Sequence, residues 1–184
     1  KKIALVSDAG TPLFCDPGAV IVKELRENGF SLTSLAGANA VATFLSQVAR
    51  EDEDFIFMGF LPKTKAQIEN IFNKYKSTDI VFYDSPNRII NTLEIIKNIR
   101  PYSKVAIGRE LTKVFEEIVI DDVEKVIEYF NTNILKGEIV GLIFREKKSA
   151  PNNDFEEQIY KLKEKGFKAK EISIILSELY NVNK

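Results

Sequence analysis

Residues 80–99, IVFYDSPNRIINTLEIIKNI, decide the fold, because a short apolar run in them is followed at once by a helical pattern. Residues 80–83 are continuously apolar, which is typical of a strand covered on both faces of a sheet. The residues after it favour a helix over 86–99, since Ser85 is a good N-cap and Pro86 fits the first helical position. A buried strand that leads into a helix is the repeating unit of α/β folds.

The same alternation continues on both sides of this stretch, and it predicts an α/β protein. Apolar runs predict further strands at 3–6, 31–35, 55–58, 104–108, 114–120 and 138–144. Helical spacing of apolar residues predicts helices at 17–28, 38–49, 68–75 and 123–130, and two short helices in the tail.

Two hydrophilic stretches mark the expected joints between parts of the chain. Residues 50–54 are five consecutive charged residues, and residues 149–153, SAPNN, have the composition of a linker. We therefore expect residues 1–52 and residues 53–148 to belong to two α/β domains. Residues 149–184 are expected to form a linker and a small helical tail.

The composition excludes several classes of chemistry. The 184 residues contain no histidine and one cysteine, Cys15, which excludes Ser-His-Asp and Cys-His catalysis, imidazole-based zinc sites and a disulfide within the chain. A single cysteine fits a reducing, cytoplasmic setting. No apolar run is long enough to predict a transmembrane helix.

The charge balance bears on possible partners. The chain has 26 basic and 27 acidic residues, for a net charge of −1. Proteins that wrap nucleic acid over their whole surface are usually strongly basic. Any contact with nucleic acid would therefore need a local basic patch.

Four loops that follow predicted strands are the best places for a ligand, because ligands of open α/β sheets bind beyond the carboxyl ends of the strands. They are residues 7–12, 36–40, 83–88 and 108–113. Each loop also has a purely structural explanation. Residues 7–12 could form a turn, and the small residues of 36–40 could allow close packing of a helix. Residues 83–88 could cap a helix, and residues 108–113 could contain an internal Arg–Glu pair. Residues 7–12, SDAGTP, lack the spacing of the phosphatase motif D-x-D-G-T, and the sequence contains no P-loop.

Six motifs in colinear order carry a resemblance to a known family. They are SDAGTP (7–12), LAGANA (35–40), FMGFLP (57–62), VFYDSPNR (81–88), GRELTKVFEE (108–117) and KGEIV (136–140). Together they resemble the bacterial methyltransferases that methylate a cytidine 2′-O-ribose of small-subunit (16S) ribosomal RNA, within the tetrapyrrole methylase (class III) superfamily. SDAGTP and RELTK are specific, whereas LAGANA and GEIV alone are weak signals.

The resemblance implies a fold and a reaction. It implies two α/β domains with S-adenosyl-L-methionine held in the cleft between them, plus a small helical tail, usually as a homodimer. It implies ribosomal RNA of the small subunit as the substrate, and it implies no metal, membrane or DNA partner. The family's first strand and Gly-rich loop have no counterpart here, so we expect residues 1–52 to be the remainder of an N-terminal domain. Such a remainder would expose an unpaired sheet edge and would bind the cofactor more weakly.

Candidate site residues follow from the matched positions. Cofactor contacts are implied at Val6, Ser7, Asp8, Asn39, Ala40, Tyr83, Asp84 and Gly108. The basic residues that could hold RNA phosphates are Lys63, Lys65, Arg88, Arg109 and Lys113. A general base for the ribose hydroxyl would help, and with no histidine the candidates are Asp84, Glu110 and Lys113. The sequence does not choose among these three.

Two other functions remain open from the sequence. A tetrapyrrole (porphyrinoid) C-methyltransferase would share the fold and the cofactor, although RELTK and SDAGTP favour the RNA enzyme. A non-enzymatic RNA- or ribosome-binding module could use the tail helices.

Overall fold

The computed structural model describes residues 2–8, 10–50, 54–133, 135–146 and 155–180. The chain divides into two compact units, Lys1–Arg145 and Glu146–Lys184. The linker predicted at 149–153 and most of the charged stretch at 50–54 lie outside the described residues. A domain boundary near residue 53 stays a prediction, because the first unit includes both sides of it.

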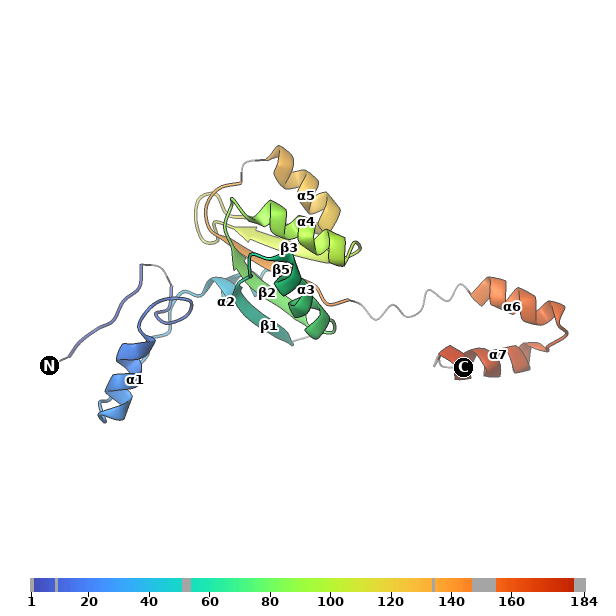
Figure 1. Cartoon of the computed structure of the whole chain (residues 1–184), viewed down its shortest axis with the longest axis horizontal. Helices are drawn as coiled ribbons and strands as arrows, with labels where there is room; N and C mark the ends of the chain where they lie inside the picture. Colours follow the sequence, from blue (N-terminus) through green and yellow to red (C-terminus); the bar gives the residue numbers. More distant parts are fainter. Residues whose placement is uncertain (1, 9, 51–53, 134, 147–154, 181–184) are drawn as a thin grey trace. The chain divides into compact units, whose positions relative to one another are not determined.

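The first unit is built on a five-stranded mixed sheet (Figure 1). Its strands are β1 (Phe55–Phe60), β2 (Asp79–Asp84), β3 (Lys104–Arg109), β4 (Glu117–Asp122) and β5 (Ile139–Ile143). Their order across the sheet is β1-β2-β5-β3-β4. Only the β1–β2 pair among these is parallel, and the other three pairs are antiparallel.

The part of the chain that the structure describes contains seven helices. In the first unit they are α1 (Ala19–Glu27), α2 (Ala40–Leu45), α3 (Lys65–Lys74), α4 (Ile89–Ile99) and α5 (Val123–Thr132). The second unit contains α6 (Phe155–Glu164) and α7 (Ala169–Tyr180). Sheet, helices and helical tail confirm the predicted α/β class.

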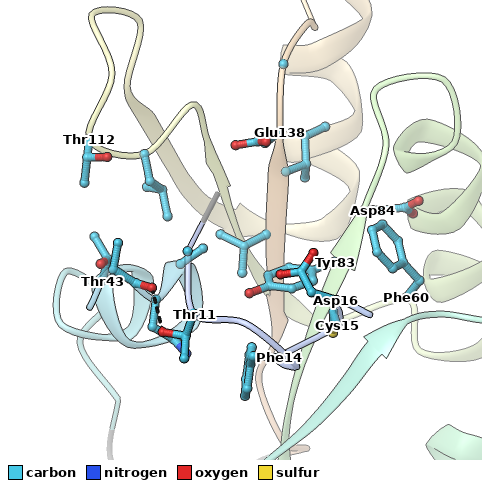
Figure 2. A pocket seen from close by; sticks show the side chains of 18 of the residues that line it. Thr11, Phe14, Cys15, Asp16, Thr43, Phe60, Tyr83, Asp84, Thr112 and Glu138 are labelled. Atoms are coloured by element: carbon cyan, nitrogen blue, oxygen red, sulfur yellow. Dashed lines mark hydrogen bonds between the residues drawn. The ribbon is translucent and has the colours of Figure 1, made fainter. Parts of the chain in front are cut away.

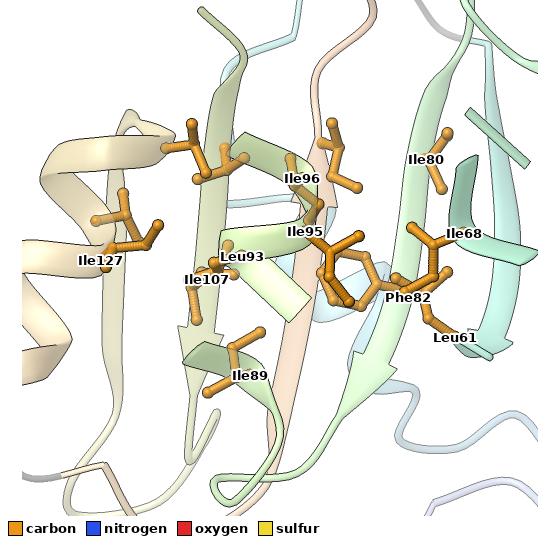
Figure 3. Close-up of a cluster of buried hydrophobic side chains, with 14 of the residues drawn as sticks. Leu61, Ile68, Ile80, Phe82, Ile89, Leu93, Ile95, Ile96, Ile107 and Ile127 are labelled. Carbon is orange, nitrogen blue, oxygen red and sulfur yellow. The ribbon is translucent and has the colours of Figure 1, made fainter. Parts of the chain in front are cut away.

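Side-chain alternation along the strands separates two cores. Ile80 and Phe82 of β2 and Ile107 of β3 pack on the face covered by α3, α4 and α5, where Figure 3 shows them among Ile68, Leu93 and Ile127. Val81 and Ala106, which alternate with them, pack on the opposite face together with Leu142 of β5. Successive residues of a strand point to opposite faces, so a continuous apolar run fits a sheet covered on both sides.

The second face is covered by α2, which belongs to the N-terminal segment. Phe44 of α2 is fully buried, together with Val41 and Val48. Gly108 of β3 makes room for the Phe44 ring, because a Cβ at that position would lie 2.7 Å from Phe44 Cδ2. This packing fixes α2, and the loop that precedes it, on the sheet.

The strands predicted at 3–6 and 31–35 are wrong. Neither segment is a strand or joins the described sheet pairing, and Ile3 is 95% and Leu35 84% exposed. A strand requires a neighbour to pair with its backbone groups, and no strand within residues 2–8 and 10–50 provides one. The strand predicted at 114–120 starts later, at Glu117, because residues 110–116 form a turn in which the N–H of Glu116 donates to the carbonyl of Lys113.

None of the described helices combines the length and the apolar character needed to cross a bilayer.

Candidate functional site

One edge of the sheet gathers the loops that carry the predicted motifs. Tyr83 near the end of β2 is paired with Phe60 at the end of β1. Ile139 at the start of β5 is paired with both Asp84 and Arg109, the last residues of β2 and β3. Because β5 runs antiparallel to its two neighbours, its beginning lies beside their ends. The loops at these strand ends therefore meet in one place.

A pocket of about 580 Å³ lies at this edge (Figure 2). Its volume is within the usual range of small-molecule sites. It is lined by residues of the loop before α1, the start of α2, the ends of β1 and β2, the β3–β4 loop and the start of β5: Asp8, Gly10, Thr11, Phe14, Cys15, Asp16, Ala38, Asn39, Ala40, Thr43, Phe60, Tyr83, Asp84, Ser85, Pro86, Leu111, Thr112, Lys113, Gly137, Glu138, Ile139 and Val140.

The loop at 10–16 is attached to the rest of the pocket by two contacts. The hydroxyl of Thr11 donates to the carbonyl of Ala38, 3.1 Å away, just before α2. The ring of Phe14 stacks on Phe57 of β1, with ring centroids 5.0 Å apart. These contacts bring Asp8 and Asp16 to a pocket that is also lined by residues of the sheet, more than 40 residues later in the chain.

Asn39 supports the wall formed by α2. Its side-chain oxygen accepts a hydrogen bond from the N–H of Ala42, 3.1 Å away, so Asn39 caps the helix. The flanking Ala38 and Ala40 are small, which leaves the pocket open beside the helix terminus.

Asp84 lines the pocket, but its carboxylate is already engaged. One oxygen accepts from the N–H of Ser85 at 2.8 Å, and the other accepts from the hydroxyl of Thr92 at 2.6 Å. Nε of Arg88 lies 3.5 Å from the first oxygen, and the carboxylate side chain is fully buried. These contacts tie the end of β2 to α4, which leaves Asp84 poorly placed to accept a proton from a substrate.

Arg88 has a structural role, because its guanidinium group is bound to other parts of the chain. Its Nη2 donates to the carbonyls of Leu61 at 2.8 Å and Pro62 at 3.4 Å. Arg88 therefore holds the chain after β1 against the end of β2.

Glu110, Lys113 and Glu138 form a second network at the pocket edge. Nζ of Lys113 lies 3.0 Å from a carboxylate oxygen of each glutamate. The same Glu110 oxygen accepts from the N–H of Glu138 at 2.9 Å, and the N–H of Glu110 donates to the Glu138 carbonyl at 3.0 Å. A Cβ on Gly137 would collide with the Glu110 side chain. The network joins the β3–β4 loop to the start of β5.

These contacts shift two pKa values away from neutrality. The N–H of Glu138, and then Lys113, lower the pKa of Glu110, since both favour its ionised form. The carboxylates of Glu110 and Glu138 raise the pKa of Lys113. A general base works best with a pKa near the working pH, so neither residue suits that role in this arrangement.

Tyr83 carries a neutral phenol into the pocket. Burial, followed by the negative charges of the Cys15 thiolate, where that thiol is ionised, and of Asp16 and Glu138, raises the pKa of Tyr83 above its usual 10.0. Tyr83 therefore keeps its proton at neutral pH and can act as a hydrogen-bond donor.

The structure brings most of the predicted cofactor residues together. Asp8, Asn39, Ala40, Tyr83 and Asp84 line the pocket. Three others are not among its lining residues: Val6 is exposed, the Ser7 hydroxyl donates to the carbonyl of Gly10, and Gly108 lies under Phe44. The cofactor contacts at Val6, Ser7 and Gly108 gain no support from the geometry.

The residues that were predicted to contact RNA lie in different local environments. Nε of Arg109 lies 3.1 Å from a carboxylate oxygen of Glu117. The Arg–Glu ion pair that was expected within residues 108–113 therefore forms with Glu117 instead of Glu110. Lys63 and Lys65 are exposed at the start of α3, and Lys65 is 3.7 Å from Glu69. Arg109 and Arg88 are thus held by the fold, whereas Lys63 and Lys65 are open to solvent.

Sequence reasoning missed several lining residues, among them Phe14, Asp16, Leu111 and Glu138. Each lies within or beside a motif that was recognised, but no local pattern marked it. Leu13 and Cys15 adopt positive φ, at 69° and 67°, which turns the loop at 13–16 in a way that non-glycine residues rarely show. Only the fold reveals this geometry.

Comparison with known proteins assigns the chain to a family. It is 35% identical over 194 residues to the ribosomal RNA small subunit methyltransferase I of Haemophilus influenzae, covering 100% of this chain and 68% of that protein. The chain belongs to the ribosomal RNA small subunit methyltransferase I family. The relative from Rickettsia prowazekii is 40% identical over 144 residues, and there the match spans 77% of this chain and 51% of the relative. The chain thus spans 51% to 68% of the length of these relatives. No protein-family model matches it.

Solved structures agree on the fold. The methyltransferase CobJ superposes with a TM-score of 0.55 at 16% identity, covering 74% of this chain and 62% of that one. The cobalt precorrin-4 methyltransferase CbiF gives 0.54 at 13% identity, with 73% and 61% covered. These tetrapyrrole methyltransferases share the fold predicted for this family.

Proposed function

We propose that this chain is the part of an S-adenosylmethionine-dependent methyltransferase that binds the cofactor, and that the whole protein methylates a ribose 2′-hydroxyl of small-subunit ribosomal RNA. The observation that carries the proposal is the pocket at the sheet edge, where residues of all six motifs or their immediate neighbours converge. Membership of the methyltransferase I family supports the substrate assignment. Such a substrate would place the protein in the cytoplasm, and the family resemblance favours a homodimer.

The lining residues fit S-adenosylmethionine. Asp8 and Asp16 offer carboxylates for the ammonium group and the ribose hydroxyls, and Tyr83 offers a phenol. Phe14, Leu111 and Ile139 offer apolar surface for an adenine ring. Once bound, the cofactor supplies a methyl group on a sulfonium, which leaves as a neutral thioether.

The residues of this chain act chiefly by alignment. The β3–β4 loop and α2 are held by the contacts described above, so they keep the pocket walls in place. Correct alignment of two reactants accounts for about 7–11 kcal/mol of barrier lowering in favourable cases. Asp84, Glu110 and Lys113 are all engaged with neighbouring groups. The hydroxyl oxygen forms its bond to the methyl carbon as the carbon–sulfur bond breaks, and we assign the proton that the hydroxyl loses to solvent water rather than to any of these three residues.

The cofactor assignment is tested by titration with S-adenosylmethionine in a calorimeter. We expect micromolar binding, and we expect Asp8→Ala to weaken it about tenfold, equivalent to about 1.4 kcal/mol. Asp54→Ala, at an exposed carboxylate that does not line the pocket, is the matched control and should leave the affinity unchanged. Unchanged affinity in Asp8→Ala would remove that residue from the site.

The substrate assignment is tested by transfer of a labelled methyl group from S-adenosylmethionine to unmodified small ribosomal subunits. A 2′-O-methylated ribose resists alkaline cleavage of the adjoining phosphodiester, so the modified position can be mapped. Label in a porphyrinoid and none in the RNA would establish the tetrapyrrole alternative instead.

A further inference from the structure

The turn between α6 and α7 carries a concentration of lysines. Residues 160–171 contain two glutamates, Glu164 and Glu171, and five lysines, in a chain whose net charge is −1. The five are exposed: Lys161, Lys163, Lys165, Lys168 and Lys170. Figure 1 shows the two helices folding back on one another about this turn.

The turn has a defined conformation. Gly166 takes a φ of +87°, and its N–H donates to the carbonyl of Lys163 at 2.9 Å. The N–H of Phe167 donates to the carbonyl of Leu162 at 3.1 Å, and the N–H of Lys168 donates to Glu171 at 2.7 Å. The lysines are therefore presented by a structured helical hairpin.

Helix stability explains only part of this charge. Lys161 and Lys163 lie in the last turn of α6, where a cation interacts favourably with the helix dipole. Lys168 immediately precedes α7, and Lys170 is its second residue, where a cation is unfavourable. The stability of the hairpin does not explain why lysine occupies these two positions, whereas binding of an anionic partner does.

Two aromatic side chains accompany the lysines. Tyr160 is 66% exposed and Phe167 is 40% exposed. Exposed aromatic rings among cations suit unpaired nucleic acid, since bases stack on the rings while phosphates contact the cations.

We propose that the α6–α7 turn is a binding surface for ribosomal RNA, in which Lys165, Lys168 and Lys170 contact phosphates and Phe167 stacks on an unpaired base. The inference rests on the proposed function, because it takes the RNA substrate from it. The cofactor pocket lies wholly within the other unit, so the two sites can be altered separately.

The test measures binding of the protein to naked small-subunit ribosomal RNA at several salt concentrations. Each phosphate contact contributes a slope of about 0.7–0.9 to the fall of log K with log salt. The variant K165Q/K168Q/K170Q should therefore lose at least about 2 units of this slope. Phe167→Ala should lose about tenfold in affinity and keep the slope, because stacking releases no counterions.

The matched control is K23Q/K74Q/K76Q, which removes three exposed lysines from the first unit. It should keep the wild-type slope, and both triple variants should keep the affinity for S-adenosylmethionine. An unchanged slope in K165Q/K168Q/K170Q, or an equal loss in the control, would overturn the proposal. Binding that weakens only with assembled subunits would assign the turn to a ribosomal protein and would also overturn it. Failure of cofactor binding in the wild type would instead contradict the proposed function.

Discussion

At the scale of single residues, Glu110 joins two stretches of chain that are 28 residues apart. Hydrogen bonds from the Glu138 N–H and from Lys113 lower its pKa below 4.5, so its stabilising charge is fully present above 4.5 and is lost as the pH falls through the lowered value. The pKa of Lys113 is raised above 10.5, so its contribution is complete below 10.5 and is lost as the pH rises through the raised value. Between these limits the charges of Glu110 and Lys113 stay constant.

We therefore expect Glu110→Gln to keep the methyl-transfer rate within about tenfold, because glutamine still accepts a hydrogen bond from the Glu138 N–H. The shape of the rate profile between about pH 6 and pH 9 should not change, whereas removal of a general base costs about 10²–10⁴-fold. The measurement is methyl transfer to small subunits over that pH range. Glu110→Ala, which leaves the Glu138 N–H without this acceptor, is the comparison variant and should be slower than Glu110→Gln. A loss of more than about 100-fold in Glu110→Gln would restore Glu110 as the base.

At the scale of secondary-structure elements, the six-residue helix α2 contributes both to the hydrophobic core and to the pocket. It covers the second face of the sheet through Phe44, and it holds Asn39 and Thr43 at the pocket. So short a helix has little stability of its own, and packing on the sheet must supply the rest. The contact between Phe44 and Gly108 therefore couples the stability of the fold to the shape of the pocket.

Gly108→Ala is expected to lower the free energy of unfolding by about 1–3 kcal/mol, because its Cβ would overlap the Phe44 ring. Cofactor affinity should fall as well, since displacement of α2 moves Asn39. Denaturant unfolding and calorimetric titration provide the two measurements. Adding Phe44→Leu, which shortens the side chain, should recover part of both losses. Independent, additive effects of the two substitutions would show that the ring and the glycine are not coupled.

At the scale of the whole molecule, the two proposed binding functions belong to different units: cofactor binding to the first unit and RNA binding by the α6–α7 turn to the second. Both hydrophobic clusters and all lining residues of the pocket lie in the first unit, within residues 8–144. The tail unit has its own small set of buried side chains, Ile172 and Leu176.

A chain ending at Arg145 should consequently keep its affinity for S-adenosylmethionine within about twofold. It should bind ribosomal RNA more weakly and with a shallower salt dependence, because the lysines of the α6–α7 turn are removed. Calorimetry and RNA binding measured side by side would check both parts. A large loss of cofactor affinity would mean that the tail contributes to the pocket.

The sequence by itself determined the α/β class and most elements of the sheet. Continuous apolar runs such as 80–83 and helical spacing such as 123–130 reflect local periodicity, which burial on one or two faces imposes directly on the residues. The family resemblance carried by the six motifs also placed Asp8, Asn39 and Tyr83 among the candidate cofactor contacts, and all three line the pocket. The tertiary structure alone decided the rest. Residues 3–6 form no strand, because a strand needs a neighbouring strand to pair with. Asp84 and Glu110 are engaged in hydrogen bonds, because their partners lie on other elements. Phe14 reaches the pocket through a loop in which Leu13 and Cys15 have positive φ. Contacts between distant residues leave no local pattern, and so the roles of these side chains could be assigned only in the folded chain.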